Sequence, residues 1–217
     1  MNRIYLPGQR RLVRQSDTAP CTVTGCRKIA THRPASNYCH MHRMRFYRNG
    51  DPLMARTPSD RDLARHRGAI ERTLRLHHSE AAVAWAITTV ERELFGYVAL
   101  QGFGYQLWAQ ERFSAMRDRG CTPMQLLARV IECYALRRDE GEYIFKRPKA
   151  FLAFLARKVL RLKHGKLLAN SNAAQLAHFG GIIDGALSKF AHATLLRMDK
   201  DREQREQFDQ AVEAMVT

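Results

Sequence analysis

Apolar residues recur every three or four positions along most of the chain beyond residue 58, which is the spacing of the buried face of an α-helix. This periodicity predicts successive helices, with no strand-like alternation between them, over residues 59–76, 79–101, 104–120, 122–138, 148–163 and 172–198. A charged terminal helix over about 199–217 follows. We therefore predict an all-α protein in which residues 53–217 form a multi-helix domain.

Capping signals support several of these helix ends. Ser59 and Asp62 have the spacing of a capping box, in which each side chain bonds a backbone amide of the first turn. Thr122 followed by a proline fits the first positions of the next long helix, and Pro148 fits the first turn of another. Residues 139–147 are predicted to form the main internal loop.

The long apolar segment that follows is predicted to be capped by Asn170 or Ser171 and is interrupted by Gly180 and Gly181. Each glycine costs a helix about 1 kcal/mol relative to alanine. The pair therefore indicates a kink or a close contact between helices. The terminal helix has apolar residues on one side, at Phe208, Val212 and Met215. We interpret it as a docking or oligomerisation helix.

Metal-ligand spacing is confined to one stretch of the N-terminal part. Cys21 and Cys26 flank Gly25, which can take the positive φ of a tight turn. Cys39 and His42 are three residues apart, so a helix starting near residue 38 would present both side chains on one side. Together they predict a closed Cys3His set, which fills all four positions of a structural metal ion and leaves none open for catalysis.

Two alternatives to this ligand set stay open. Either His32 or His40 could replace His42, and the cysteines could also be reduced and unligated. The cysteines at 121 and 133 fall in helical patterns far from this stretch and are interpreted as small buried hydrophobic residues.

Residues 21–52 resemble a small zinc-binding module found at the N-termini of many phage and mobile-element proteins, including a class of HNH endonucleases. The usual form is C-x4-C, a short spacer, C-x2-H-Y, basic residues and a closing G-D-P. The matching residues here are Cys21, Cys26, Cys39, His42, Arg43, Arg45, Arg48, Gly50, Asp51 and Pro52. The resemblance implies a treble-clef-like finger with one structural Zn²⁺. The chain departs from the pattern at Arg43, where an aromatic residue is customary.

The formal net charge of +15 favours a polyanionic partner. Residues 1–75 hold 16 Lys or Arg and only 5 Asp or Glu, so the charge is concentrated on and around the finger. Residues 1–20 are interpreted as a basic arm, with a solvated tail as the alternative. The predicted nucleic-acid contacts of the finger are Lys28, Arg33, Arg43, Arg45 and Arg48.

A second cationic surface is predicted on the helix over 148–163, which carries Arg157, Lys158 and Arg161 beside an apolar stripe. Three interpretations stay open for this helix. It could contact a phosphate backbone, lie on an anionic membrane, or place its cations on the solvated face of a core helix.

These features predict a zinc-dependent nucleic-acid-binding protein, with duplex DNA as the expected polymer and regulation of transcription or replication as the expected output. The helical domain is expected to bind a second copy or another protein. Alternatives are a protein-interaction adaptor or inhibitor, a nuclease or recombination factor, and an RNA-binding protein. The chain offers no His–Asn hairpin of the HNH type, so we do not predict an enzyme. No apolar run approaches the length of a membrane span, and we expect a cytoplasmic protein without a membrane partner.

Overall fold

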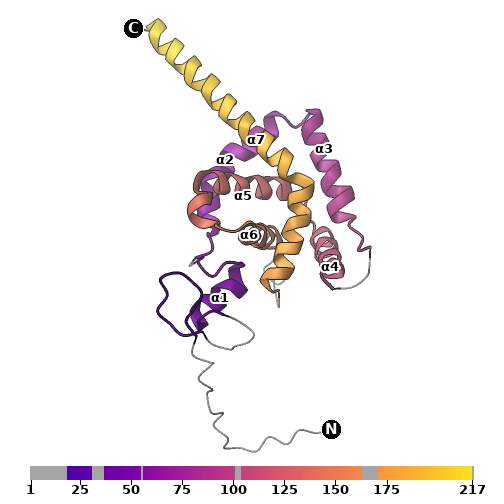
Figure 1. Cartoon of the computed structure of the whole chain (residues 1–217). Helices are drawn as coiled ribbons and strands as arrows, with labels where there is room; N and C mark the ends of the chain where they lie inside the picture. Colours follow the sequence, from indigo (N-terminus) through magenta and orange to yellow (C-terminus); the bar gives the residue numbers. More distant parts are fainter. Residues whose placement is uncertain (1–18, 31–36, 55, 101–103, 163–170, 217) are drawn as a thin grey trace, which may run out of the picture.

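The computed structural model describes residues 19–30, 37–54, 56–100, 104–162 and 171–216. Within these ranges the regular elements are all helices, so the predicted all-α class is confirmed. Figure 1 shows a small N-terminal finger with one helix at one end of a helical bundle, and the C-terminus at the other end. The elements are α1 (His40–Asn49), α2 (Asp60–Leu76), α3 (Ala81–Thr89), the π-helical segment η2 (Val90–Phe95), α4 (Gly104–Asp118), α5 (Pro123–Ile144), α6 (Pro148–Leu160) and α7 (Ala173–Val216).

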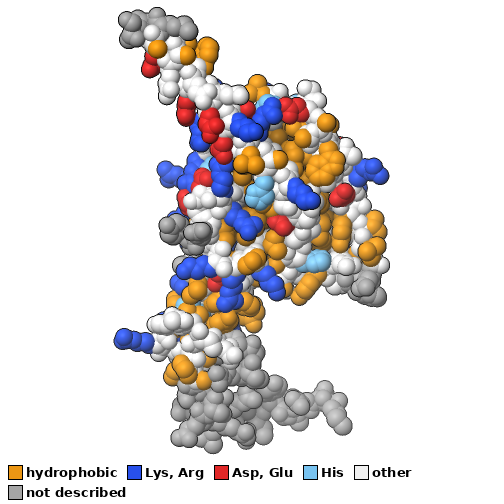
Figure 2. All heavy atoms as spheres, turned by 45° about the horizontal axis from the view of Figure 1, so that its top comes forward, with side chains coloured by type: hydrophobic (Ala, Val, Ile, Leu, Met, Phe, Trp, Pro, Cys, Tyr) orange, Lys and Arg blue, Asp and Glu red, His pale blue; other side chains and the backbone are white. Residues whose placement is uncertain are grey.

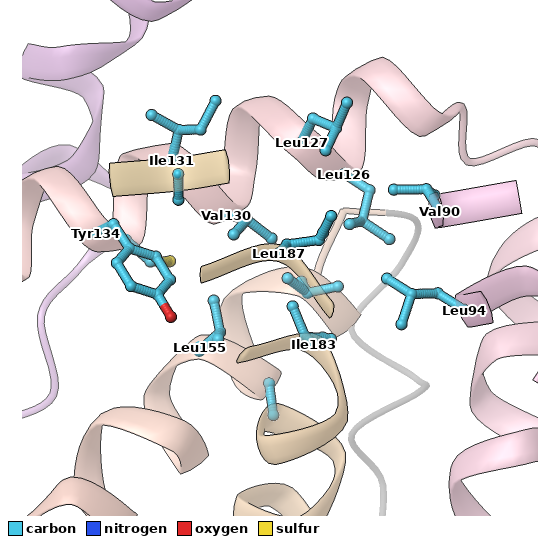
Figure 3. Packing of buried hydrophobic residues seen from close by; sticks show 14 of the residues in the cluster. Val90, Leu94, Leu126, Leu127, Val130, Ile131, Tyr134, Leu155, Ile183 and Leu187 are labelled. Atoms are coloured by element: carbon cyan, nitrogen blue, oxygen red, sulfur yellow. The ribbon is translucent and has the colours of Figure 1, made fainter. Parts of the chain in front are cut away.

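The hydrophobic core lies where α5, α6 and α7 meet. Figure 3 shows Val130 of α5, Leu155 of α6 and Leu187 of α7 in one cluster, which Leu94 of η2 closes at its edge. All four side chains are at most 1 % exposed. The helical periodicity of the sequence therefore produces one continuous core across the bundle.

The glycine pair in α7 marks a close contact between helices, and α7 continues through it without a break. A Cβ atom on Gly180 would overlap the carbonyl oxygen of Leu152 in α6 and lie 2.7 Å from its carbonyl carbon. For a Cβ on Gly181, the nearest heavy atom outside the adjoining part of α7 would be the Leu152 Cδ1, at 4.0 Å. Gly180 thus lets the two helix backbones approach.

Two of the predicted helix starts are confirmed in detail. Ser59 accepts a hydrogen bond from the Asp62 amide, and the Asp62 carboxylate accepts one from the Ser59 amide. Thr122 and Gln125 form the same reciprocal pair at the start of α5, with Pro123 in its first turn. The start of α7 is capped by Asn172, which exchanges two such bonds with Gln175, and not by Ser171. Residue 170, the other candidate cap, lies outside the described residues.

The loop predicted over 139–147 is wrong for residues 139–144, because α5 continues to Ile144, and only residues 145–147 separate α5 from α6. The last polar turn of α5 is held to α2 by an ion pair between Glu140 and Arg65 at 2.6 Å, and Asp139 lies 3.6 Å from His66. Just beyond the helix, Phe145 packs into the core, with its ring centroid 4.9 Å from that of Phe154. Contacts from distant elements therefore extend the helix.

The predicted separate terminal helix is also wrong, because α7 runs unbroken from Ala173 to Val216. Asp199 pairs with Arg138 of α5 at 2.9 Å, and Asp201 lies 3.3 Å from His77 at the end of α2. These pairs hold the charged segment in line with the rest of α7. Every described side chain from residue 202 to 214 is exposed, and its predicted role in docking or oligomerisation stays a prediction.

The helix predicted over 79–101 ends early, at Phe95. The amide of Gly96 donates to the carbonyl of Glu91, five residues back, which closes a wide π-type turn. Across the described ranges, no helix has both the length and the apolar character that crossing a bilayer requires.

Replacing Gly180 by alanine should destabilise the bundle, because the new methyl group would have to displace the α6 backbone. We expect Gly180→Ala to lower the free energy of unfolding by about 2 kcal/mol, although alanine is the better helix former. Gly181→Ala is the matched control and should be neutral or stabilising by up to about 1 kcal/mol. Urea denaturation measures both; equal stability of the two variants would contradict the close approach at Gly180.

Candidate metal centre and nucleic-acid interface

The first two candidate ligands lie on a tight knuckle. Its ends are joined by an antiparallel bridge between Pro20 and Ile29, and the Cys21 amide donates to the Lys28 carbonyl at 2.9 Å. Gly25 has the predicted positive φ, 78°, which reverses the chain between the two cysteines. The turn therefore places the Cys21 and Cys26 sulfurs in the same ligand cluster.

The other two candidate ligands lie at the start of α1. Cys39 is the N-cap residue in an extended conformation, and its carbonyl accepts a hydrogen bond from the Arg43 amide. His42 is in the first turn, so its side chain lies on the same side as that of Cys39. The helix begins at His40, two residues later than expected. A knuckle followed by the start of a helix is the arrangement predicted for a treble-clef-like finger.

The four side chains are placed to hold one metal ion. Their ligand atoms all lie within 4.8 Å of one another, and no disulfide joins these cysteines. The sulfurs of Cys26 and Cys39 are 3.9 Å apart, and the Nδ1 atom of His42 is 3.3 Å from the Cys21 sulfur and 3.4 Å from the Cys39 sulfur. Tetrahedral ligands with bonds of about 2.1–2.3 Å are separated by about 3.5–3.8 Å. The residues therefore fit a tetrahedral site.

The surroundings of Cys21 favour its thiolate form. Burial raises the pKa of this thiol, but backbone hydrogen bonds at Cys39 and Val23 and the side-chain bond with His42 outweigh burial and bring the pKa to about 6. Metal ions bind the thiolate form of cysteine. The folded knuckle is thus chemically prepared for a cation.

The structure also distinguishes between two of the candidate histidines. His42 is buried within the cluster, whereas the exposed His40 lines a hollow on another side of α1. His32 lies outside the described residues. Of the two described histidines, only His42 belongs to the ligand set.

Asn49, the last residue of α1, joins the finger to the helical domain. Its side chain donates to the Met54 carbonyl at 2.9 Å and accepts hydrogen bonds from Thr57 at 2.8 Å and from Arg157 of α6 at 3.3 Å. The next residue, Gly50, has φ of 73°, ends the helix as predicted and lies against the backbone of Lys149. Sequence reasoning missed Asn49, because nothing in the local pattern reveals its three distant partners.

Arginines from the finger and from α6 converge beside this junction. Arg45 and Arg48 of α1 and Arg157 of α6 line one hollow of about 550 Å³. Burial, followed by the charges of Arg161 and Arg48, lowers the pKa of Arg157. Within the described part of the chain, no carboxylate lines this hollow or forms an ion pair with these three arginines. Figure 2 shows Lys and Arg side chains where the finger meets the bundle.

The prediction that Lys158 belongs to a cationic surface is wrong. Its side chain is 1 % exposed, and its ammonium group lies 2.9 Å from the Asp60 carboxylate at the start of α2. One position along α6 thus separates an arginine facing the hollow from a lysine inside the core. Lys158 lies four residues after Phe154 on the buried side of α6, and the Asp60 carboxylate compensates the buried charge.

The remaining predicted contact residues are dispersed. Arg43 lies over the ring of Tyr47, 5.8 Å from its centroid, on the other side of α1. Lys28 is exposed on the knuckle, and Arg161 is exposed just after α6. Arg33 lies outside the described residues. The structure therefore brings together Arg45, Arg48 and Arg157, with Arg161 close enough to affect the pKa of Arg157.

A second hollow, of about 580 Å³, lies on the opposite side of α1. Phe46 and Tyr47 line it from the finger, and Tyr105 of α4 and His178 of α7 line it from the bundle. It is mainly apolar, whereas the hollow around Arg48 is cationic. Helix α1 thus separates two surfaces of different chemistry.

Replacing Cys39 by serine should unfold the finger and leave the helical domain folded. Among its described residues the finger has one small buried cluster, at Cys21, Val23 and Cys39, so we expect its fold to depend on metal binding. Amide hydrogen exchange should show lost protection in α1 and retained protection in α5. Cys121→Ser, which changes a buried cysteine outside the cluster, is the control and should preserve both. Full protection of α1 in Cys39→Ser would contradict a metal-dependent finger.

Comparison with known proteins leaves the chain without a relative that could assign its family. No protein-family model, curated protein or solved structure matches it. The resemblance of residues 21–52 to the phage and mobile-element finger module therefore stays a prediction, and any functional conclusion must come from the geometry of the site.

Proposed function

We propose that this protein is a zinc-dependent nucleic-acid-binding protein and that it binds DNA with a double-stranded segment. One observation carries the proposal: arginines of the finger and of the helical domain line one hollow with no described carboxylate among them. Clustered cations without counter-charge repel one another and are stabilised by a bound anion. A phosphate backbone supplies several anionic groups in a row and releases counterions on binding.

Zinc is the metal that the ligand chemistry favours. Three sulfurs and one imidazole are soft and borderline ligands, which suit zinc better than magnesium or calcium. All four tetrahedral positions would be filled by protein side chains, so the ion supports the fold and has no open position for a substrate. Cys21, Cys26, Cys39 and His42 would hold it, and its contribution would be to fix the start of α1.

The finger's part in binding would be to fix the direction of α1. With the start of α1 held by the ligands and its end held by Asn49, Arg45 and Arg48 are presented beside Arg157. Arg161 adds charge at the end of α6, and Lys28 adds it on the knuckle. Guanidinium groups suit this task because they bind phosphate oxygens with paired hydrogen bonds. Regulation of transcription or replication would follow from such binding.

The salt dependence of duplex binding tests this proposal. The zinc-loaded protein should bind random-sequence duplex DNA with a steep negative slope of log affinity against log salt. The triple variant Arg45→Ala, Arg48→Ala, Arg157→Ala should flatten the slope by about two to three units, because each phosphate contact contributes about 0.9.

The matched control removes the same charge elsewhere, as Arg72→Ala, Arg75→Ala, Arg92→Ala on exposed positions of α2 and η2. It should change the slope by less than one unit. If both triple variants changed the salt slope equally, binding would depend on net charge alone. This result would contradict the proposed surface. No binding to DNA or RNA at moderate salt would overturn the proposed function and favour a protein-interaction role.

A further inference from the structure

The apolar hollow beside α1 has the size and lining of a site for a planar ligand. Its volume of about 580 Å³ lies within the range of about 300–1,000 Å³ that is typical of small-molecule sites. Tyr47 and Tyr105 line it from two separate elements and are 49 % and 46 % exposed. These rings are only half buried, so a ligand in the hollow could cover their remaining exposed surface.

The rings are held in place by neighbours. The Phe46 centroid lies 5.6 Å from that of Tyr38 and 6.3 Å from that of Tyr47, and Arg43 covers one side of the Tyr47 ring. Across the hollow, the Tyr105 and His178 rings are 6.1 Å apart. Ligand binding would therefore require little ordering of these side chains, which lowers its entropic cost.

The few polar groups around the hollow suit a heteroaromatic ring attached to a phosphate. Lys149 lines the hollow and can contact an anion, and the amide of Asn172 can exchange hydrogen bonds with the edge of a base.

The apolar hollow and the cationic hollow are both lined by residues of α1. Tyr47 and Arg48 are consecutive residues of α1, and they line the apolar hollow and the cationic hollow respectively. A nucleic acid whose phosphates contact Arg48 would reach the site lined by aromatic rings by passing over α1 to its other side. Stacking of an unpaired base on aromatic side chains is a common way in which proteins bind single-stranded segments.

We infer that this hollow binds an unpaired base, so that the protein prefers DNA in which an unpaired nucleotide adjoins duplex. The inference rests on the proposed nucleic-acid binding and narrows its substrate class. Uniform duplex would engage only the arginines, whereas a bulged or single-stranded nucleotide would also bury its base among the rings.

Binding to three duplexes of one sequence tests the inference: fully paired, with a one-nucleotide bulge of 2-aminopurine, and with the same bulge made abasic. The wild-type protein should bind the 2-aminopurine bulge about tenfold more tightly than the abasic bulge, because stacking on an aromatic residue contributes roughly 1–3 kcal/mol per base. The abasic bulge keeps the backbone shape and charge, so the difference reports the base alone. Quenching of 2-aminopurine fluorescence on binding should report the stacking directly.

The double variant Tyr47→Leu, Tyr105→Leu keeps apolar bulk but removes the stacking rings. It should lose the preference for the base and the quenching while it keeps its affinity for the abasic bulge. Trp85→Leu, which removes a 52 % exposed aromatic side chain from α3, is the matched control and should change neither. Equal binding of both bulges by wild type, without quenching, would overturn the inference and leave the proposed function intact. Absence of binding to all three duplexes would instead contradict the proposed function itself.

Discussion

The convergence of four metal ligands is the constraint on which the N-terminal part of the molecule depends. Among its described residues the finger has one small cluster of buried apolar side chains, formed by Cys21, Val23 and Cys39, and two of these are candidate ligands. Such a cluster is too small to offset the entropy of ordering the chain. The free energy of metal binding can supply the difference. The direction of α1 would therefore depend on a metal ion held at its start.

The other end of α1 is fixed by a different kind of interaction. Asn49 joins the linker and α6 through hydrogen bonds, and Gly50 allows the chain to turn against Lys149. The two sides of α1 then face the cationic and the apolar hollow. Both candidate ligand surfaces thus combine residues from the finger and from the helical domain, and neither part of the chain forms them alone.

Interactions local in sequence were predictable. The ligand spacing, the positive φ of Gly25, the capping box at Ser59 and the helix start at Thr122 each depend on a few consecutive residues, and the geometry confirms all four predictions. The all-α class followed from periodicity, because one buried face per helix is enough to predict it. The sequence could not identify the ion or show that DNA is bound, and these remain proposals.

Interactions between distant residues were not predictable. Arg157 and Lys158 look alike in an amphipathic pattern, and only the fold shows the lysine buried against Asp60 of another helix. The hydrogen-bond partners of Asn49, at residues 54, 57 and 157, appear only in the fold. The sequence allowed either a kink or a close helix contact at Gly180. The structure shows the close contact, because the backbone of Leu152 lies against Gly180. Residues 139–144, expected to be part of a loop, are helical, and this end of α5 contacts α2 and α6.

The most direct test of the account is to measure zinc content and duplex affinity on the same samples while a chelator removes the metal. The account predicts one zinc per chain at the start, a loss of affinity in proportion to the zinc removed, and recovery when zinc is restored. Undiminished duplex affinity in the zinc-free protein would show that α1 does not need the metal to present its arginines, and would contradict the central claim.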